Sequence, residues 1–365
     1  MRGMKRILLH PRIRPLLLLL LCLGSSSGAF AVIVDGLYDQ EIVVQGQGDA
    51  ERLRAYREGL SAAILKITGE QRWLRNSAVE RAIRDAQSYV QEVSYRTSAV
   101  GLEQRTYISV RFDRALVENM LNSAGIPVWD QNRPTVMLWL SVQGPDGRRE
   151  LLGADSEHPL LEIVREYSRI HGVPLLFPLM DLEDRRNLPI DVAWSLDAEA
   201  IRTASQRYEA DAILSGRILE STGGDLVGLW QFLFRDKVES FDSFEQDYQR
   251  YGEAALERIT PELASHYGLL RLNNPLQIRL QVANVDSARD YKDLLQYIQS
   301  LAVVENVSAA LLNGDSIELD LSLTGNVFLF TEFIALGREM AAVPSTPELV
   351  IDESAPQVLQ YRWLR

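Results

Sequence analysis

The amino-acid sequence predicts a mixed α/β and α+β protein built from three modules. Three observations predict this class: short runs of alternating apolar and polar residues, longer runs with an apolar residue every three or four positions, and turn residues between them. At 365 residues the chain is also longer than one ordinary domain. We expect an N-terminal α+β module at 32–130, a central α/β module at 131–270 and a C-terminal module at 271–365.

Residues 1–31 have the composition of a cleavable secretory signal. Five basic residues precede an apolar run from Leu16 to Leu23, and Ala29-Phe30-Ala31 is a small-x-small cleavage sequence. The apolar run is shorter than the about 20 residues that cross a bilayer. We therefore expect export, with cleavage after Ala31 and no stable membrane span afterwards. An uncleaved N-terminal anchor is the alternative.

The cysteine count and the charge narrow the classes of function. Cys22 is the only cysteine and lies inside the signal, so we expect neither a disulfide nor a thiolate metal site in the exported chain. The whole chain has a net charge of −12, and loss of the five basic residues of the signal leaves 33 Lys and Arg against 50 Asp and Glu, a net of −17. This acidity repels phosphate backbones, so nucleic acid is not an expected partner.

The N-terminal module is predicted to follow the order β-α-α-β-β-α. Asp49 is the expected N-cap of the first helix, and Gly69 its end. The other predicted elements are strands at Glu41–Gln45, Val93–Thr97 and Arg105–Phe112, a second helix at about Ser77–Val90, and a third helix that begins after Asp113. We expect these helices to cover one face of an antiparallel sheet.

The central module follows an expected linker at Asp130–Pro134 and is predicted to contain a parallel β-α-β unit. A strongly apolar strand at Thr135–Val142, a helix at about His158–His171 and a strand at Pro174–Phe177 make up this unit. An acidic loop spans Asp181–Asp191. The later predicted elements are a helix at about Asp197–Tyr208, strands at Ala212–Leu219 and Leu226–Phe234 that form a hairpin, and a helix at about Tyr251–His266.

The C-terminal module has the clearest pattern in the chain. Apolar residues alternate along a strand from Leu276 to Val282, and Asn313-Gly314 is a favoured two-residue hairpin turn. The remaining predicted elements are a helix from about Tyr291 to Leu301, hairpin strands at Val303–Leu312 and Ile317–Leu323, a helix at about Val327–Met340 and a last strand at Val358–Trp363. The order β-α-β-β-α-β predicts a ferredoxin-like fold.

Four segments carry a resemblance to a known family: Glu41 to Leu60, the strand end Phe177–Asp181, the segment Ala210–Ile218 and the helix at Asp290-Tyr291. Together they resemble, over nearly the whole mature chain, an uncharacterised proteobacterial family called domain of unknown function 2066 (DUF2066). This resemblance implies a periplasmic protein of a Gram-negative envelope and assigns no activity.

Two weaker similarities exist at the level of the fold. The central module is similar to the curli-secretion, penicillin-binding-protein-activator and Tol-B N-terminal type of domain, in which an Ala-Asp-Ala segment like Ala210-Asp211-Ala212 also follows a helix. The N-terminal module is similar to the first domain of the flagellar T-ring protein. The similarity of the central module implies binding and scaffolding, although a fold does not decide a function.

The densest acidic cluster consists of Asp181, Glu183 and Asp184. It follows the carboxyl end of a predicted central strand, where open α/β sheets bind their ligands. Neighbouring carboxylates there are candidates for binding a divalent cation or for general acid–base chemistry. Arg185 and Arg186 follow directly and favour the alternative, a solvated loop whose charges pair with one another.

Two further features are candidate binding residues. Asp211 precedes a predicted strand and is a buried polar anchor, a ligand-binding group, or an aspartate that bonds to its own turn, as an Asp before a strand most often does. Trp230, Phe232 and Phe234 fall on one face of a predicted strand. They form a partner-binding stripe if that strand lies at the edge of its sheet, and fill the core otherwise.

The sequence contains no phosphate-binding loop, nucleophile elbow or dinucleotide-binding fingerprint, and the three histidines of the mature chain lie far apart. We expect no catalytic residue, no cofactor and no metal. The sequence favours an exported, non-enzymatic binding or assembly factor whose partner is another envelope protein. A metal-dependent hydrolase that uses Asp181, Glu183 and Asp184 is one alternative, and a small-ligand carrier with an apolar cavity is another.

Overall fold

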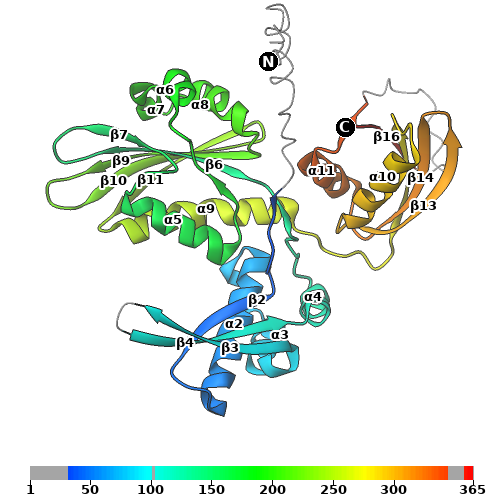
Figure 1. Cartoon of the computed structure of the whole chain (residues 1–365), viewed down its shortest axis with the longest axis horizontal. Coiled ribbons are helices and arrows are strands. Elements are labelled where there is room, and N and C mark those ends of the chain that lie inside the picture. Colours follow the sequence, from blue (N-terminus) through cyan, green and yellow to red (C-terminus); the bar gives the residue numbers. More distant parts are fainter. Residues whose placement is uncertain (1–31, 101–102, 344–356, 365) are drawn as a thin grey trace, which may run out of the picture. The chain divides into compact units, whose positions relative to one another are not determined.

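This computed structural model of the protein describes residues 32–100, 103–343 and 357–364. The predicted signal at 1–31 lies outside the described residues. Sheets of three, six and five strands, together with helices and a two-stranded pairing, make up the described chain (Figure 1). The predicted mixed α/β class is therefore confirmed. Of the helices in the described part of the chain, none has the length and hydropathy that crossing a bilayer requires.

The first sheet is antiparallel, with the strand order β2-β4-β3. Leu60, Ile64 and Ile67 recur at helical spacing along helix α2 and are buried in the core that it forms with this sheet. The expected N-cap, Asp49, is instead the first residue inside α2, and Gly69 ends the helix with a φ of 68°. The elements are β2 (Asp39–Val44), α2 (Asp49–Thr68), α3 (Ser77–Arg84), β3 (Val90–Val100), β4 (Glu103–Phe112) and α4 (Arg114–Ser123).

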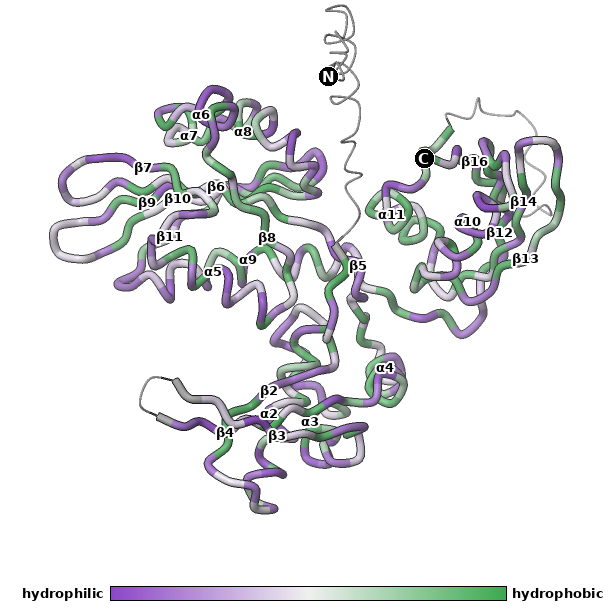
Figure 2. Tube along the Cα trace, viewed as in Figure 1, coloured by the Kyte–Doolittle hydropathy of each residue, from purple (hydrophilic) through white to green (hydrophobic). Residues whose placement is uncertain are grey.

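The second sheet has the strand order β11-β10-β9-β6-β7, and β8 also pairs with β6. Helices α5 and α9 cover one face, and α6, α7 and α8 cover the other (Figure 1). Strand β6 is buried at every position except its last, and its tube is hydrophobic along most of its length in Figure 2. The strands are β6 (Val136–Gln143), β7 (Arg149–Leu152), β8 (Leu175–Leu176), β9 (Ala212–Glu220), β10 (Leu226–Phe234) and β11 (Lys237–Glu245). The helices are α5 (Pro159–His171), α6 (Leu182–Asn187), α7 (Ile190–Ser195), α8 (Ala198–Ser205) and α9 (Tyr248–Tyr267).

The predicted parallel pair, formed by β6 and β8, is shorter than expected. Strand β8 has two residues, because Pro174 and Pro178 on either side of it lack the N–H that a longer ladder needs. The long parallel partner of β6 is β9, which pairs with it from Val136↔Ala212 to Gln143↔Leu219. The edge strands β7 and β11 were not predicted, because charged residues interrupt their apolar pattern.

The third sheet has the strand order β13-β14-β12-β16-β15 and is not the predicted ferredoxin-like arrangement. The strand that follows the second helix is β15, and it lies at the edge. Strand β16 lies between β12 and β15 and runs parallel to β12. The elements are β12 (Leu276–Ala283), α10 (Ala288–Ser300), β13 (Val304–Asn313), β14 (Ser316–Leu323), α11 (Val327–Gly337), β15 (Met340–Ala342) and β16 (Gln357–Trp363). The prediction failed because the three-residue β15 is too short to show an alternating pattern.

The predicted linker at Asp130–Pro134 is instead a buried junction. Strand β5 (Asn132–Arg133) pairs with β1 (Val32–Ile33), and the Arg133 side chain is fully buried. All five N–H groups of its guanidinium are used, at 2.7–3.1 Å. The acceptors are the backbone carbonyls of Lys66, Trp129, Asp130, His171 and Gly172.

Arg133 donates hydrogen bonds to carbonyl groups at the ends of two helices. Lys66 lies in the last turn of α2, and His171 and Gly172 end α5. The last carbonyls of a helix have no partner within it and carry the negative end of its dipole, so a buried cation stabilises both helix ends at once. The guanidinium also lies 4.1 Å from the ring centroid of Trp129. Burial lowers the pKa of Arg133 to about 9, so the group stays charged at neutral pH.

We predict that Arg133→Met lowers the free energy of unfolding by about 3 kcal/mol or more, because it leaves buried carbonyls without donors. Urea denaturation followed by circular dichroism measures this change as a lower midpoint. Arg148→Met is the control, because the Arg148 side chain is exposed in the turn before β7. If the two variants unfold at the same urea concentration, Arg133 does not have this role.

Candidate functional site

The acidic segment Asp181–Asp191 is helical rather than a loop. Asp181 is the N-cap of α6, and its Oδ1 accepts the backbone N–H of Asp184 at 2.9 Å. The segment 182–195 forms α6 and α7, with Pro189 between them. Asp191 lies in α7 and pairs with Arg149 of β7 at 3.2 Å, so it does not extend the cluster.

Arg207, which the sequence did not single out, pairs with all three candidate carboxylates. Its Nη1 lies 2.9 Å from Asp181, 3.1 Å from Asp184 and 3.5 Å from Glu183. The expected partners Arg185 and Arg186 do not have this role, and Arg185 instead donates to the backbone carbonyl of Met180. Arg207 lies 26 positions after Asp181 and reaches it only because η3 (Gln206–Tyr208) lies beside α6.

Asp184 is the most buried member of the cluster, with a fully buried side chain. Its Oδ2 accepts the backbone N–H of Met180 at 2.9 Å and the hydroxyl of Tyr208 at 2.6 Å. Met180 has a φ of 54°, a conformation that non-glycine residues rarely adopt, so these bonds hold a strained turn. Burial, followed by the bond to Asp184, raises the pKa of Tyr208 to about 12.

The hydrogen bonds of the cluster therefore stabilise the turn that connects β8 to α6. Within the described ranges, no group of three or more His, Cys, Asp or Glu side chains has the arrangement of a metal site. A cavity of about 680 Å³ lies next to the cluster and is lined by Met180 and Arg185, but by none of the three carboxylates. The geometry does not aim these acids at a common ligand.

The aromatic stripe belongs to the core. Trp230, Phe232 and Phe234 are buried, and the Trp230 ring lies 5.3 Å from that of Tyr251 in α9. Strand β11 pairs with β10 along its whole length, so β10 is not an edge strand. The proposed partner-binding role of these residues is therefore wrong, and the core-filling alternative accounts for them.

Asp211 is a partly buried anchor that joins three elements. Its Oδ2 accepts the backbone N–H of Thr135 at 2.8 Å and the Thr135 hydroxyl at 3.0 Å, and its Oδ1 accepts from Arg338 at 2.9 Å. Burial raises the pKa of Asp211, and the bonds from Thr135 and Arg338 oppose this rise. Thr135 precedes β6 and Asp211 precedes β9, so the bond ties the starts of two parallel strands. Arg338 ends α11 and connects that helix to them.

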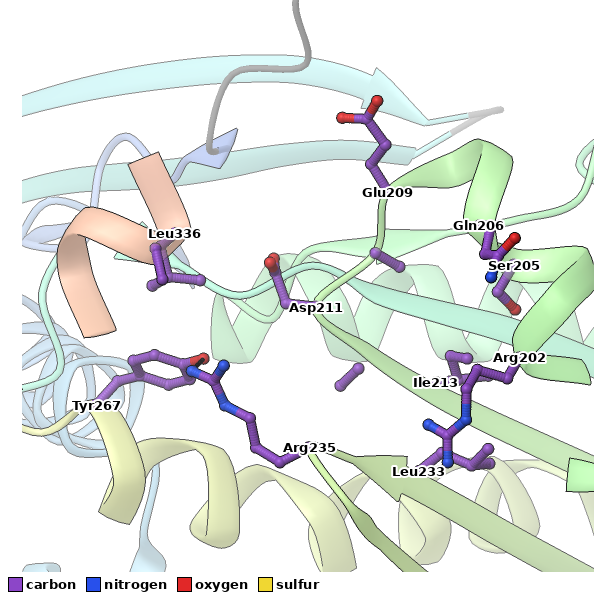
Figure 3. A pocket seen from close by; sticks show the side chains of 13 residues that line it. Arg202, Ser205, Gln206, Glu209, Asp211, Ile213, Leu233, Arg235, Tyr267 and Leu336 are labelled. Atoms are coloured by element: carbon purple, nitrogen blue, oxygen red, sulfur yellow. Dashed lines mark hydrogen bonds between the residues drawn. The ribbon is translucent and has the colours of Figure 1, made fainter. Parts of the chain in front are cut away.

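A pocket with a cavity volume of about 340 Å³ lies beside Asp211, and we call it the Asp211 pocket (Figure 3). Residues from α8, η3, the start of β9, the end of β10, the end of α9 and α11 line it. Its polar side chains belong to Arg202, Ser205, Gln206, Glu209, Asp211, Arg235 and Tyr267, and its apolar ones to Ala210, Ala212, Ile213, Leu233, Ala335 and Leu336. Of these residues, only Asp211 was a candidate from the sequence.

The edge of the third sheet is a second surface that the sequence did not single out. Strand β13 has one strand neighbour, β14, among the described residues. Every residue from Ser308 to Asn313 is exposed, with Leu311 at 52% and Leu312 at 66%. Leu311 follows an irregularity in the pairing with β14, between Ala309 and Leu311.

A comparison with family models gives a match to the N-terminal part of the chain. The family model described as "Domain of unknown function (DUF8605)" matches residues 31–130, the segment that contains the first sheet. The resemblance to DUF2066 over nearly the whole mature chain is therefore wrong, because the family that matches is a different one. No curated protein matches the chain.

We predict that Arg207→Met raises the pKa of Asp181 from about 2 toward its ordinary value of 3.8, because the hydrogen bond from Arg207 is the main cause of the lowered pKa. NMR titration of the Asp181 carboxyl carbon measures the change. In the parent protein the depressed pKa contributes stability above pH 3.8 that is lost as the pH falls through about 2, and the variant lacks this contribution. Arg186→Met is the control and leaves this pKa unchanged. Equal Asp181 pKa values in the two variants would assign the shift to another group.

Proposed function

We propose that the protein is exported to the periplasm and acts there as a non-enzymatic binding or assembly factor whose partner is another envelope protein. The basic and apolar residues of the segment 1–31 support export. The observation that carries the binding role is the edge strand β13, which is exposed from Ser308 to Asn313 and has no charged residue after Glu305. An edge strand presents unpaired backbone N–H and C=O groups to which a partner segment adds as a further strand.

Strand β13 differs from the other long edge strands in the described part of the chain. The edge strand of the second sheet, β11, carries Lys237, Glu239, Asp242 and Glu245. Such charges discourage the addition of a strand. In contrast, β13 has no charged residue from Asn306 to Asn313, and two leucines are exposed near its end. The edge strand of the first sheet, β3, carries Glu92 and Arg96.

The charges around β13 indicate the chemistry of the partner. Glu305 lies at the start of the strand and Asp315 in the hairpin turn that follows it. Nearby acidic residues on β14, Glu318 and Asp320, are already paired with Arg279 of β12. An extended segment with an apolar centre and basic residues on either side therefore fits this edge, and nucleic acid or a second acidic surface does not.

The hydrolase alternative has less support. It needs Asp181, Glu183 and Asp184 to act on a substrate, whereas all three pair with Arg207 and two of them hold the turn and cap before α6. Asp211 is likewise engaged by Thr135 and Arg338.

We predict that a photo-crosslinking residue at position 312 captures a partner in intact cells, whereas the same residue at position 244 on β11 does not. Phe244 is a matched control because its side chain is 63% exposed on an edge strand of another sheet. Mass spectrometry identifies the crosslinked protein and the segment that touches β13.

The captured partner, once purified, provides the quantitative test. Leu312→Lys places a positive charge on the edge and is expected to weaken binding at least about tenfold, whereas Phe244→Lys leaves it unchanged. Isothermal titration calorimetry measures both affinities. A partner that binds the Leu312→Lys variant as tightly as the parent does not use this edge, and turnover of a substrate that depends on Asp184 would favour the hydrolase instead.

A further inference from the structure

We propose that the Asp211 pocket binds a small organic carboxylate with an apolar body, and that Arg202 holds its carboxylate. This site is separate from strand β13 and goes beyond the proposed partner binding. Its cavity of about 340 Å³ falls at the lower end of the range for small-molecule sites.

Two guanidinium groups face the pocket. Figure 3 shows Arg202 beside Ile213 and Leu233, and Arg235 beside Tyr267, on different sides of the cavity. The ion pair of Arg202 with Glu199 is long, at 3.8 Å, and the Glu199 side chain is 87% exposed, so solvent screens it. Arg202 therefore keeps most of its capacity to bind an anion.

Arg235 is held in place at the other side. It donates to the hydroxyl of Tyr267 at 3.2 Å and forms an ion pair with Glu332 of α11. Its φ of 57° is unusual for a residue with a side chain. Glu209, which ends η3, and Arg338, which ends α11, have the same rare left-handed conformation, at 49° and 55°. Three of the strained residues in the described chain thus lie around Asp211.

The acids that line the pocket do not neutralise Arg202. Asp211 is engaged by Thr135 and Arg338, and in Figure 3 the Glu209 carboxylate points away from the cavity. The apolar side of the pocket is formed by Ile213 and Leu233, which are buried, and by Leu336. A ligand that combines one anionic group with an apolar body matches both halves of this lining.

A carboxylate fits better than a phosphate. Ser205 is the last residue of α8 and Gln206 the first of η3, so carbonyl groups at a helix end contribute partial negative charge to the pocket. Asp211 adds a further negative charge nearby. These charges repel a dianionic phosphate more than a monoanionic carboxylate, and the planar guanidinium group of Arg202 matches a carboxylate in two-pronged hydrogen bonds.

Glu332 neutralises Arg235. Glu332 also lies 2.7 Å from Nε2 of His266, so α11 is tied to α9 and to the β10–β11 turn through one carboxylate. Arg235 therefore has less capacity to bind an anion than Arg202. Removal of the Arg202 charge is expected to weaken ligand binding more than removal of the Arg235 charge.

Hexanoate is a suitable probe, because it has one carboxylate and a short apolar chain. In an NMR titration of the purified protein, we expect saturable shifts of the Ala212 and Ile213 amides with hexanoate. Uncharged hexanamide should bind at least about tenfold more weakly, and inorganic phosphate should give no saturable shift at these amides.

Variants assign the binding to Arg202. Arg202→Met should weaken hexanoate binding about tenfold, whereas Arg235→Met, which removes a cation already paired with Glu332, should weaken it less. Arg250→Met, at the far end of α9 from Tyr267, is the control and should bind like the parent. The Leu312→Lys variant should also bind hexanoate normally, which separates this site from the partner-binding edge.

Three results would overturn the proposal: no saturable shift with hexanoate, equal binding of hexanoate and hexanamide, or Arg202→Met binding as tightly as Arg250→Met. Thermal unfolding of each variant checks that the fold is intact. Arg202→Lys keeps the positive charge and should bind hexanoate more tightly than Arg202→Met, a difference that a misfolded pocket would not produce.

Discussion

The burial of the Arg133 guanidinium is the interaction on which much of this structure depends. The guanidinium donates to the carbonyl group of Lys66 in the last turn of α2 and to those of His171 and Gly172 at the end of α5, so it contacts the ends of two helices. A cation taken out of water is costly unless hydrogen bonds replace its hydration. Five carbonyl acceptors and the face of Trp129 provide that replacement. Residues that the sequence presents as a polar linker therefore form a buried junction between two elements of regular structure.

The other charged residues of the second sheet follow the same principle. Asp184, Asp181 and Arg207 close the turn before α6, and Asp211 ties the starts of β6 and β9 to each other. In each case a carboxylate satisfies backbone N–H groups that the chain leaves unpaired at the end of an element. In the sequence these carboxylates are candidates for a functional site because they lie next to strand ends. In the structure they accept hydrogen bonds from the protein itself. The features that support binding are those whose hydrogen-bonding groups are not fully used within the described chain: the backbone edge of β13 and the guanidinium of Arg202.

The outcome at individual residues shows which patterns are informative. The apolar positions of β12 and the Asn313-Gly314 turn were predictable, because a two-residue period and a left-handed Gly314 at a φ of 63° are local properties. The burial of Trp230, Phe232 and Phe234 agrees with the core-filling alternative. In contrast, nothing local marks Arg207 as the partner of Asp181, or Arg338 as the partner of Asp211, since 26 and 127 positions separate these pairs. The division of the chain at residues 130 and 270 stays a prediction.

The sequence by itself determined the mixed α/β class and the position of most helices and strands, because hydrophobic period, caps and turn residues act over a few positions. It also predicted export, from residues outside the described structure. Only the tertiary structure decided that β16 lies between β12 and β15, that β8 is short and β9 is the long partner of β6, and which side chains surround the Asp211 pocket. These features depend on contacts between residues far apart in the chain, and a periodic pattern shows which face of an element is buried but not which element covers it.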